Sequence, residues 1–216
     1  MKTIRITGKG NLKVRPDTTR ITLTLNEVRR EYADALRVSS EKTESLRDLL
    51  SGFGLARTDL KTLNFSVDTE YESYREKGEY KQRFIGYRYR HVMKVEFPSD
   101  NERLGKILYG LSASPLSPEF RISYVVSDPE AKKNELLEKA VQDARTKAEV
   151  LTRAAGVTLK DIWSIDYSWG EVDFEVRPMN ELPMLSKIDA EASLKMDIEP
   201  DDIDMSDTVT VTWEVA

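Results

Sequence analysis

The sequence predicts a protein of two long helices and several strands, and three features indicate this. Residues 30–53 and 128–155 carry apolar residues at steps of three and four, which is the spacing of one buried helix face. Residues 61–75 and 87–97 alternate apolar with polar side chains, as strands with one buried face do. The glycine-containing segment Arg75–Tyr80 between them is predicted to be the turn of a long hairpin.

The N-terminal segment is predicted to form two strands joined by a tight turn. Residues 3–7 and 19–25 alternate in strand fashion, and the sequence GKGN at residues 8–11 contains the Gly and Asn that tight hairpin turns require. Its two glycines lack the third glycine of a dinucleotide-binding loop, and Pro16 follows where such a fold would begin a helix. We therefore expect a turn here and no phosphate site.

The second long helix has strong signals at both ends. Asp128, or the serine before it, can cap the first turn, and Pro129 suits that turn because its missing N–H is not needed there. Gly156 can adopt the left-handed conformation that ends a helix, with Val157 folding back as the apolar contact of the cap.

Small residues dominate the predicted buried face of that helix, which indicates close packing on a sheet or on another helix. Its apolar stripe consists of Leu137, Ala140, Val141, Ala144, Ala148, Leu151 and Ala155. The stripe of the first long helix consists of Leu36, Thr43, Leu46, Leu50 and Phe53.

The sequences that follow the two helices resemble each other. Residues 54–63 align without gaps with residues 156–165, and each begins with a glycine, continues with an apolar residue and leads through a short turn into a strand. We interpret this as two helix-to-strand units that form a weak internal repeat. Chance, or turn chemistry that both segments share, is the alternative interpretation.

One register of the long hairpin would bring opposite charges together across the two strands. Cross-strand pairs of this kind stabilise antiparallel sheets, and this one also keeps the apolar side chains of both arms on one face. The predicted pairs are Tyr71 with Tyr87, Asp68 with Arg90, and Glu70 with Arg88.

The apolar face of the hairpin is the candidate interaction surface. An arm from Leu60 to Arg75 at about 3.4 Å per residue reaches about 50 Å, whereas a compact chain of this length is about 44 Å across. The hairpin is therefore expected to project and to expose an apolar ribbon, and such patches mark interfaces. The alternative is that a helix of the same chain covers the whole ribbon. The candidate interface residues are Phe65, Tyr71, Tyr87, Tyr89 and Met93.

The composition limits the chemistry. The 216 residues include no cysteine, which excludes disulfides, thiolate metal sites and a cysteine nucleophile. Metal binding would depend on carboxylates and His91, which we expect to be a half-buried structural residue opposite Val67. We expect no catalytic residue, no cofactor, no metal and no small-molecule ligand.

The N-terminal sequence and the distribution of apolar residues suggest a cellular location, and the distribution of charge identifies an acidic segment. No apolar run approaches the ~20 residues of a membrane span, and MKTIRITGKG lacks the apolar stretch of a secretory signal. We therefore expect a cytoplasmic protein, or a periplasmic one if a leader was removed. The net charge is −5, and residues 170–207 hold twelve acidic against three basic residues, so we expect a mobile acidic excursion at residues 173–199.

Several groups of residues together resemble the SIMPL-domain family, which includes bacterial periplasmic immunogenic proteins. The matching segments are ITGKGNLKVRPDTTRITLTL, GLARTDLKTLNFSVDTEY, IGYRYRHVMKVEF, the helix from SDPEAKKNELL to TRAAGV, and DTVTVTWEV. They follow one another in the same order as in the family and cover nearly the whole chain. The opening pattern, the Gly-Tyr strand and the Ala-rich helix are together fairly diagnostic.

The resemblance implies an α+β fold, with an antiparallel β-sheet and two long packed helices. It implies one SIMPL-like domain over residues 1–216, with halves of approximately 1–97 and 98–216. It brings no established catalytic residues, an association of bacterial relatives with stress or envelope phenotypes, and a tendency of some members to self-assemble.

Three functional hypotheses follow. A non-enzymatic oligomeric scaffold or protein-interaction module is favoured, with self-association or a protein partner. A hydrolase using carboxylates is the alternative, although Asp17, Asp59 and Asp161 occupy positions typical of turns and caps. Nucleic-acid binding is a further alternative and disfavoured, because Glu76 and Glu79 accompany the basic residues of the hairpin tip. That tip contains Arg75, Lys77, Lys81 and Arg83 with Tyr74, Tyr80 and Phe84.

Overall fold

The computed structural model describes residues 2–167, 175–176 and 199–216. It confirms an α+β fold with antiparallel sheets. The acidic excursion expected at residues 173–199 lies almost wholly outside the described residues. No described helix is both long and apolar enough to cross a membrane.

The chain divides into two compact units. Unit 1 contains the described residues within 1–17, 125–176 and 200–216, and unit 2 contains residues 18–124. This division differs from the expected halves, because the strands of unit 1 come from both ends of the chain and unit 2 is inserted between them. That the whole chain acts as one domain stays a prediction.

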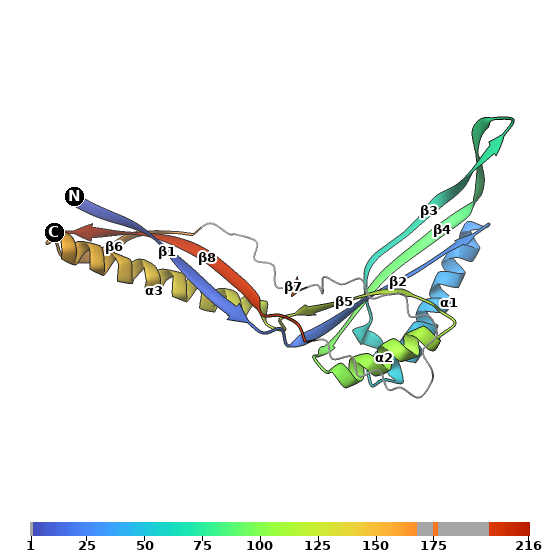
Figure 1. The fold of residues 1–216 in the computed structure, drawn as a ribbon, viewed down its shortest axis with the longest axis horizontal. Helices are drawn as coiled ribbons and strands as arrows, with labels where there is room; N and C mark the ends of the chain where they lie inside the picture. The colour runs from blue at the N-terminus through green and yellow to red at the C-terminus, as the bar shows by residue number, and fades with distance from the viewer. Residues whose placement is uncertain (1, 168–174, 177–198) are drawn as a thin grey trace. The chain divides into compact units, whose positions relative to one another are not determined.

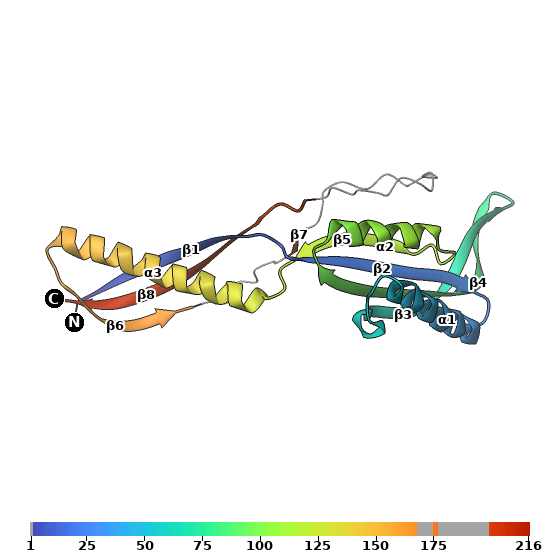
Figure 2. The same cartoon turned by 90° about the horizontal axis from the view of Figure 1, so that it is seen from below.

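Unit 1 is a three-stranded antiparallel sheet with one long helix along it (Figures 1 and 2). The strand order is β1-β8-β6, with β1 at Lys2–Val14, β8 at Ile203–Val215 and β6 at Leu159–Asp166. The helix α3, Pro129–Ala155, packs on β1 and β8. A two-residue strand, β7, lies at Glu175–Val176.

The predicted turn at residues 8–11 is wrong, because β1 runs through it without interruption. Its glycines instead allow the strand to lie directly on α3. A Cβ at Gly8 would be 2.0 Å from the carbonyl oxygen of Ala140, and one at Gly10 would be 2.1 Å from that of Leu136. Real Cβ atoms do not come that close, so both positions require glycine.

The predicted ends of α3 are confirmed. The Asp128 carboxylate accepts a hydrogen bond from the Ala131 N–H at 2.9 Å, and Pro129 begins the helix. Gly156 has φ 66°, and the Val157 N–H donates to the Thr152 carbonyl.

The buried stripe of α3 differs partly from the prediction. It follows a strict four-residue step, so Leu151 and Ala155 lie outside it and are exposed, whereas Leu137 and Val141 are partly buried beside it. The buried residues are Leu136, Ala140, Ala144, Ala148 and Thr152.

Unit 2 contains four strands in the order β3-β4-β2-β5, of which β3 pairs with β4 and β4 with β2 in antiparallel fashion. Two α-helices contribute to its single large core. Its elements are β2 Thr18–Arg29, α1 Tyr32–Ser51, the 3₁₀ turn η1 Arg57–Asp59, β3 Lys61–Glu76, β4 Glu79–Pro98, α2 Asn101–Ala113 and β5 Glu119–Val125.

The helix α2 was not predicted from the sequence. Asp100 caps it by accepting a hydrogen bond from the Arg103 N–H at 3.0 Å, and its buried residues include Leu104, Ile107 and Leu111. The two long helices that were predicted lie in different units, α1 in unit 2 and α3 in unit 1, each against its own sheet.

The two predicted helix-to-strand units have the same local geometry. Gly54 and Gly156 both have positive φ, 77° and 66°. In each, the next residue returns its N–H to a helix carbonyl five residues earlier, Leu55 to Leu50 and Val157 to Thr152. The two similar ten-residue segments therefore begin with the same helix-end motif.

The hairpin register differs from the prediction by two residues up to Glu70 and by three beyond it. Asp68 lies opposite Arg88, and Tyr71 lies opposite Phe84 across a bulge. The turn is where it was expected, since Lys77 and Gly78 at the tip have positive φ. The shift of two residues keeps the side chains from Asn64 to Glu70 paired on their expected faces, whereas the bulge after Glu70 changes the pairing of the distal arms.

Candidate functional site

Four aromatic rings form a continuous row along one side of the hairpin. Tyr71 contacts Phe84 with ring centroids 5.8 Å apart, Phe84 contacts Tyr87 at 5.3 Å, and Tyr87 contacts Tyr32 at 5.5 Å. All three contacts are edge-to-face, the arrangement that aromatic pairs prefer. Tyr71 and Phe84 are 53% and 47% exposed, so this aromatic row (Tyr32, Tyr71, Phe84 and Tyr87) is fixed in place yet open to solvent.

The helix α1 covers only the base of the predicted apolar ribbon. Tyr89 and Met93 are completely buried in the core of unit 2, so they do not belong to the exposed surface that was predicted to include them. Phe65 is exposed at the edge strand and contacts the His91 ring. Because α1 begins at Tyr32, none of the described helical residues extends over the distal arms (Figure 1).

A backbone irregularity marks the point where the hairpin leaves the sheet. The register shifts between Glu70 and Tyr71, and the facing Gly86 has φ 148°. A Cβ at Gly86 would be 2.2 Å from the carbonyl oxygen of Arg29, the last residue of β2. Beyond this point β4 has only β3 as a neighbour, and nearly all of its side chains are exposed.

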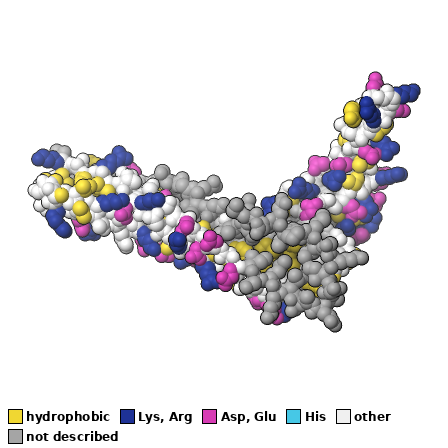
Figure 3. Space-filling model, viewed as in Figure 1, with side chains coloured by type: hydrophobic (Ala, Val, Ile, Leu, Met, Phe, Trp, Pro, Cys, Tyr) yellow, Lys and Arg dark blue, Asp and Glu magenta, His cyan; other side chains and the backbone are white. Residues whose placement is uncertain are grey.

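Charges on the hairpin are neutralised locally. Arg88 forms a two-pronged ion pair with Glu70 at 2.7 and 2.9 Å, and this hydrogen bonding lowers the pKa of Glu70. Farther out, Arg83 pairs with Glu72 at 2.6 Å. Figure 3 shows hydrophobic and charged side chains interspersed along these arms.

The tip of the hairpin is arranged differently from a nucleic-acid site. Lys81 pairs with Glu76 at 2.6 Å. Arg75 lies over the Tyr80 ring at 5.8 Å, and Arg83 lies over the Tyr74 ring at 6.0 Å. The aromatic faces on which bases would stack are thus partly occupied by guanidinium groups of the same hairpin.

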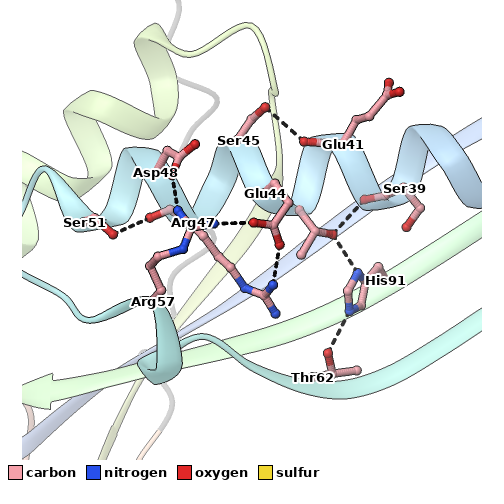
Figure 4. A network of polar contacts seen from close by, with 11 residues as sticks. Ser39, Glu41, Glu44, Ser45, Arg47, Asp48, Ser51, Arg57, Thr62 and His91 are labelled. Atoms are coloured by element: carbon pink, nitrogen blue, oxygen red, sulfur yellow. Dashed lines mark hydrogen bonds and ion pairs between the residues drawn. The ribbon is translucent and has the colours of Figure 1, made fainter.

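His91 is held between a helix and the edge strand of the sheet (Figure 4). Its Nδ1 is 3.0 Å from the Thr43 hydroxyl on α1, and its Nε2 is 2.8 Å from the Thr62 hydroxyl on β3. Because the Thr43 hydroxyl donates to the Ser39 carbonyl, it accepts from the ring, which places the proton of the neutral imidazole on Nδ1. Burial, followed by the nearby positive charge of Arg47, lowers the pKa of His91.

His91 thus links α1 to β3, and it lies opposite Phe65 and not Val67. Its purely structural role stays a prediction. Both of its threonine partners were missed by sequence reasoning. Thr43 was recognised only as part of the helix stripe, and its polar group at an apolar position was the available signal.

A second buried polar group has no such support. The Tyr89 hydroxyl is buried and has no hydrogen-bond partner among the described residues. Burial, with the negative charge of Glu27, raises the pKa of Tyr89 to about 12.

Ion pairs hold the connection from α1 to β3 against the helix. Arg57, in the 3₁₀ turn of this connection, pairs with both Glu44 and Asp48 of α1 (Figure 4).

The three candidate carboxylates lie in separate local settings. Asp17 accepts hydrogen bonds from the Ser127 N–H at 2.8 Å and hydroxyl at 2.6 Å. Asp59 accepts from the Ala56 N–H at 2.8 Å within the 3₁₀ turn. Asp161 is exposed on β6. Within the described ranges, no three His, Asp or Glu side chains gather as metal ligands.

Comparison with known proteins identifies the family. The model of the family described as "SIMPL: Protein of unknown function (DUF541)" matches residues 4–213. The chain belongs to the SIMPL family. The match includes all of residues 18–124 of unit 2 and nearly all of unit 1, so the inserted arrangement of the two units falls within the SIMPL segment.

One curated SIMPL relative is "Uncharacterized protein YggE" of Edwardsiella ictaluri (strain 93-146). It is 23% identical over 209 residues, which cover 97% of this chain and 85% of the relative. Among solved structures, CutA from Synechococcus elongatus PCC7942 matches 60% of this chain and 95% of its own, at 14% identity and a TM-score of 0.21. A similarity at that TM-score supports no structural or functional inference.

Proposed function

We propose that this SIMPL protein is a non-enzymatic oligomeric scaffold, and that the aromatic row of the hairpin is its association surface. The single observation that supports this most directly is the row itself. Aromatic side chains are enriched in interface cores, and rings already held by one another lose little conformational entropy when a partner covers them.

The local charge balance favours a second copy of the chain as the partner. Residues 70–88 contain four acidic and five basic side chains, and the pairs Glu70–Arg88 and Glu72–Arg83 lie within one hairpin. Two such hairpins would not repel each other, because neither carries a large net charge. A nucleic acid would instead favour a strongly basic surface.

One face of the hairpin has two different environments within unit 2. The same face is covered by α1 at its base, where it supplies core residues such as Tyr89 and Met93. Among the described residues no helix covers this face beyond Tyr32, where the hairpin has its bulge opposite Gly86 and separates from β2. A second molecule bound to the distal part would bury the apolar side chains that α1 leaves exposed.

Sedimentation velocity across a range from about 1 to 100 μM tests the proposal. The expected result is a concentration-dependent oligomer that the Tyr71→Glu/Phe84→Glu variant converts to a monomer. Tyr109→Glu is the matched control, because Tyr109 is a similarly exposed aromatic residue on α2. A parent chain that is monomeric throughout, or a double variant that associates like the parent, would overturn the proposal.

A further inference from the structure

The two parts of helix α1 are attached to the sheet of unit 2 with different strength. Residues 43–51 bury Leu46 and Leu50 in the core. Residues 32–42 contain one leucine, Leu36, and it is 39% exposed. The buried side chains of this first part are Ala35, Val38 and Ser39. Less apolar surface therefore holds the first part of the helix to the sheet than the second.

Polar contacts divide the helix at the same place. The second part is joined to β4 by the contact of Thr43 with His91, and to the following turn by the ion pairs of Arg57. In the first part, Arg37 forms two ion pairs that both stay within the helix. The N-cap residue, Glu31, provides no side-chain hydrogen bond to the first turn. The first part is thus the more weakly attached of the two.

The first part of α1 lies over Tyr89. Tyr32 at its start contacts Tyr87, and Thr43 just beyond its end contacts His91. Tyr89 lies between Tyr87 and His91 on the same face of β4, because alternate residues of a strand point to the same side. The distance along the strand from Tyr87 to His91 is about 14 Å, and the helix from Tyr32 to Thr43 spans about 17 Å, so the helix covers this stretch of β4.

The polar side chains beneath the first part are incompletely paired. The Tyr89 hydroxyl and the Arg29 Nε are buried and have no hydrogen-bond partner among the described residues. Glu27, which lies opposite Tyr89 on β2, pairs with Arg29 at 2.5 Å and with Lys42 of α1 at 2.7 Å. A buried polar group without a hydrogen bond costs free energy, and exposure to water recovers it. Opening of the first part of α1 would hydrate these groups.

We propose that residues 32–42 form a lid that opens as one unit about a hinge at Thr43, while residues 43–51 stay attached. The lid carries Tyr32, so the aromatic row is complete only while the lid is closed. Association through the row should therefore favour the closed lid, because a binding partner shifts an equilibrium toward the state that it binds more tightly. This link to association rests on the proposed function, whereas the lid itself does not.

Hydrogen exchange followed residue by residue by NMR tests the lid. The Tyr71→Glu/Phe84→Glu variant is used, so that association through the row does not contribute. The amides of residues 36–42 should share one protection factor, at least about ten-fold lower than that of residues 47–50, because a single opening exposes them all. Equal protection of the two groups would overturn the inference. Protection that rises stepwise from the start of the helix, as in fraying, would also overturn it.

Tyr89→Phe tests what the lid covers. It removes the unpartnered hydroxyl from the closed state, so the protection factors of residues 36–42 should rise about five-fold. Tyr124→Phe is the matched control and should not raise them, because Tyr124 is similarly buried but lies on β5, two strands away from β4. Lys42→Met removes the ion pair with Glu27 and should lower them several-fold. Unchanged protection in Tyr89→Phe would overturn the inference, since an opening that leaves Tyr89 covered does not respond to this substitution.

Exchange of the parent chain over the concentration range of the sedimentation experiment separates the lid from the proposed function. Mass spectrometry of peptides from residues 36–42 should show protection that increases with the oligomer fraction. Constant protection while the mass of the protein increases would overturn the link between the lid and association. A parent chain that is monomeric throughout would overturn the proposed function and this link together, while the lid would still be decided by exchange in the double variant.

Discussion

Gly8 of β1 lies so close to α3 that a Cβ at this position would be 2.0 Å from the carbonyl oxygen of Ala140. The nearest atom is backbone, so no side-chain rotation can relieve the clash. We expect Gly8→Ala to lower the free energy of unfolding by on the order of 3 kcal/mol. Chemical denaturation measures this, with Gly52→Ala as control, because Gly52 has φ −61° and a more tolerant environment. Equal stability of the two variants would show that β1 and α3 are not in contact.

Enlarging the helix side of the same contact should also destabilise unit 1. Ala144 and Ala148 are completely buried, and the Ala144 Cβ is within 2.7 Å of the position that a Cβ on Gly8 would take. Ala144→Leu is expected to reduce stability by on the order of 1 to 3 kcal/mol, because the added carbons have no space to occupy. Ala154→Leu, on the exposed side of the helix, should change it by less than about 0.5 kcal/mol. A denaturation midpoint that is lower for Ala154→Leu than for Ala144→Leu would refute the close packing of α3 on β1.

The buried imidazole of His91 predicts a pH dependence of stability. The fold lowers the pKa of this group, so the neutral ring is favoured in the native state and the unfolded chain binds more protons below about pH 6.5. Stability from His91 is therefore fully present above that pH and decreases as the pH falls from about 6.5 toward the lowered native pKa. Urea unfolding between pH 5 and 7.5 should show this decrease in the parent and a flatter profile in His91→Gln. Parallel profiles would contradict the assignment.

The unpartnered hydroxyl of Tyr89 makes one substitution unusual. Removing a buried polar group that has no hydrogen bond also removes its desolvation cost, so Tyr89→Phe should leave stability unchanged or raise it by about 1 kcal/mol. Thr43→Val is the contrasting change. Its hydroxyl bonds both Ser39 and His91, and its loss should lower stability by about 1 to 2 kcal/mol. Thermal unfolding that finds Tyr89→Phe the less stable of the two would show that the hydroxyl has a partner.

Local patterns in the sequence predicted the elements that depend on local interactions. The caps of α3, the turn at Lys77 and Gly78, and the shared glycine ends of α1 and α3 all appear as expected, because each is decided within a few residues. The roles of Gly8 and Gly10 could not be predicted in this way. Their neighbours on α3 are more than 120 residues away, and a glycine required by close approach looks like a glycine required by a turn.

The candidate site was predicted only in part, because some of its features depend on contacts between residues far apart in the sequence. Alternation along the hairpin identified the apolar face, which includes Phe65, Tyr71 and Tyr87, and the length of the arms predicted that the hairpin projects beyond the core. It could not show where α1 begins, and that start at Tyr32 decides which residues of the face are buried. The bulge near Gly86 was equally hidden, since it depends on the end of β2.

Hydroxyl-radical footprinting at increasing protein concentration tests the central claim most directly, because it measures the exposure of individual aromatic side chains. If the aromatic row is an association surface, oxidation of Tyr71 and Phe84 should fall several-fold as the protein associates, while Tyr109 on α2 should be oxidised at an unchanged rate. Protection of Tyr71 and Phe84 that follows the oligomer fraction is the predicted result. Constant oxidation of both residues across a concentration range in which the protein's mass increases would contradict it.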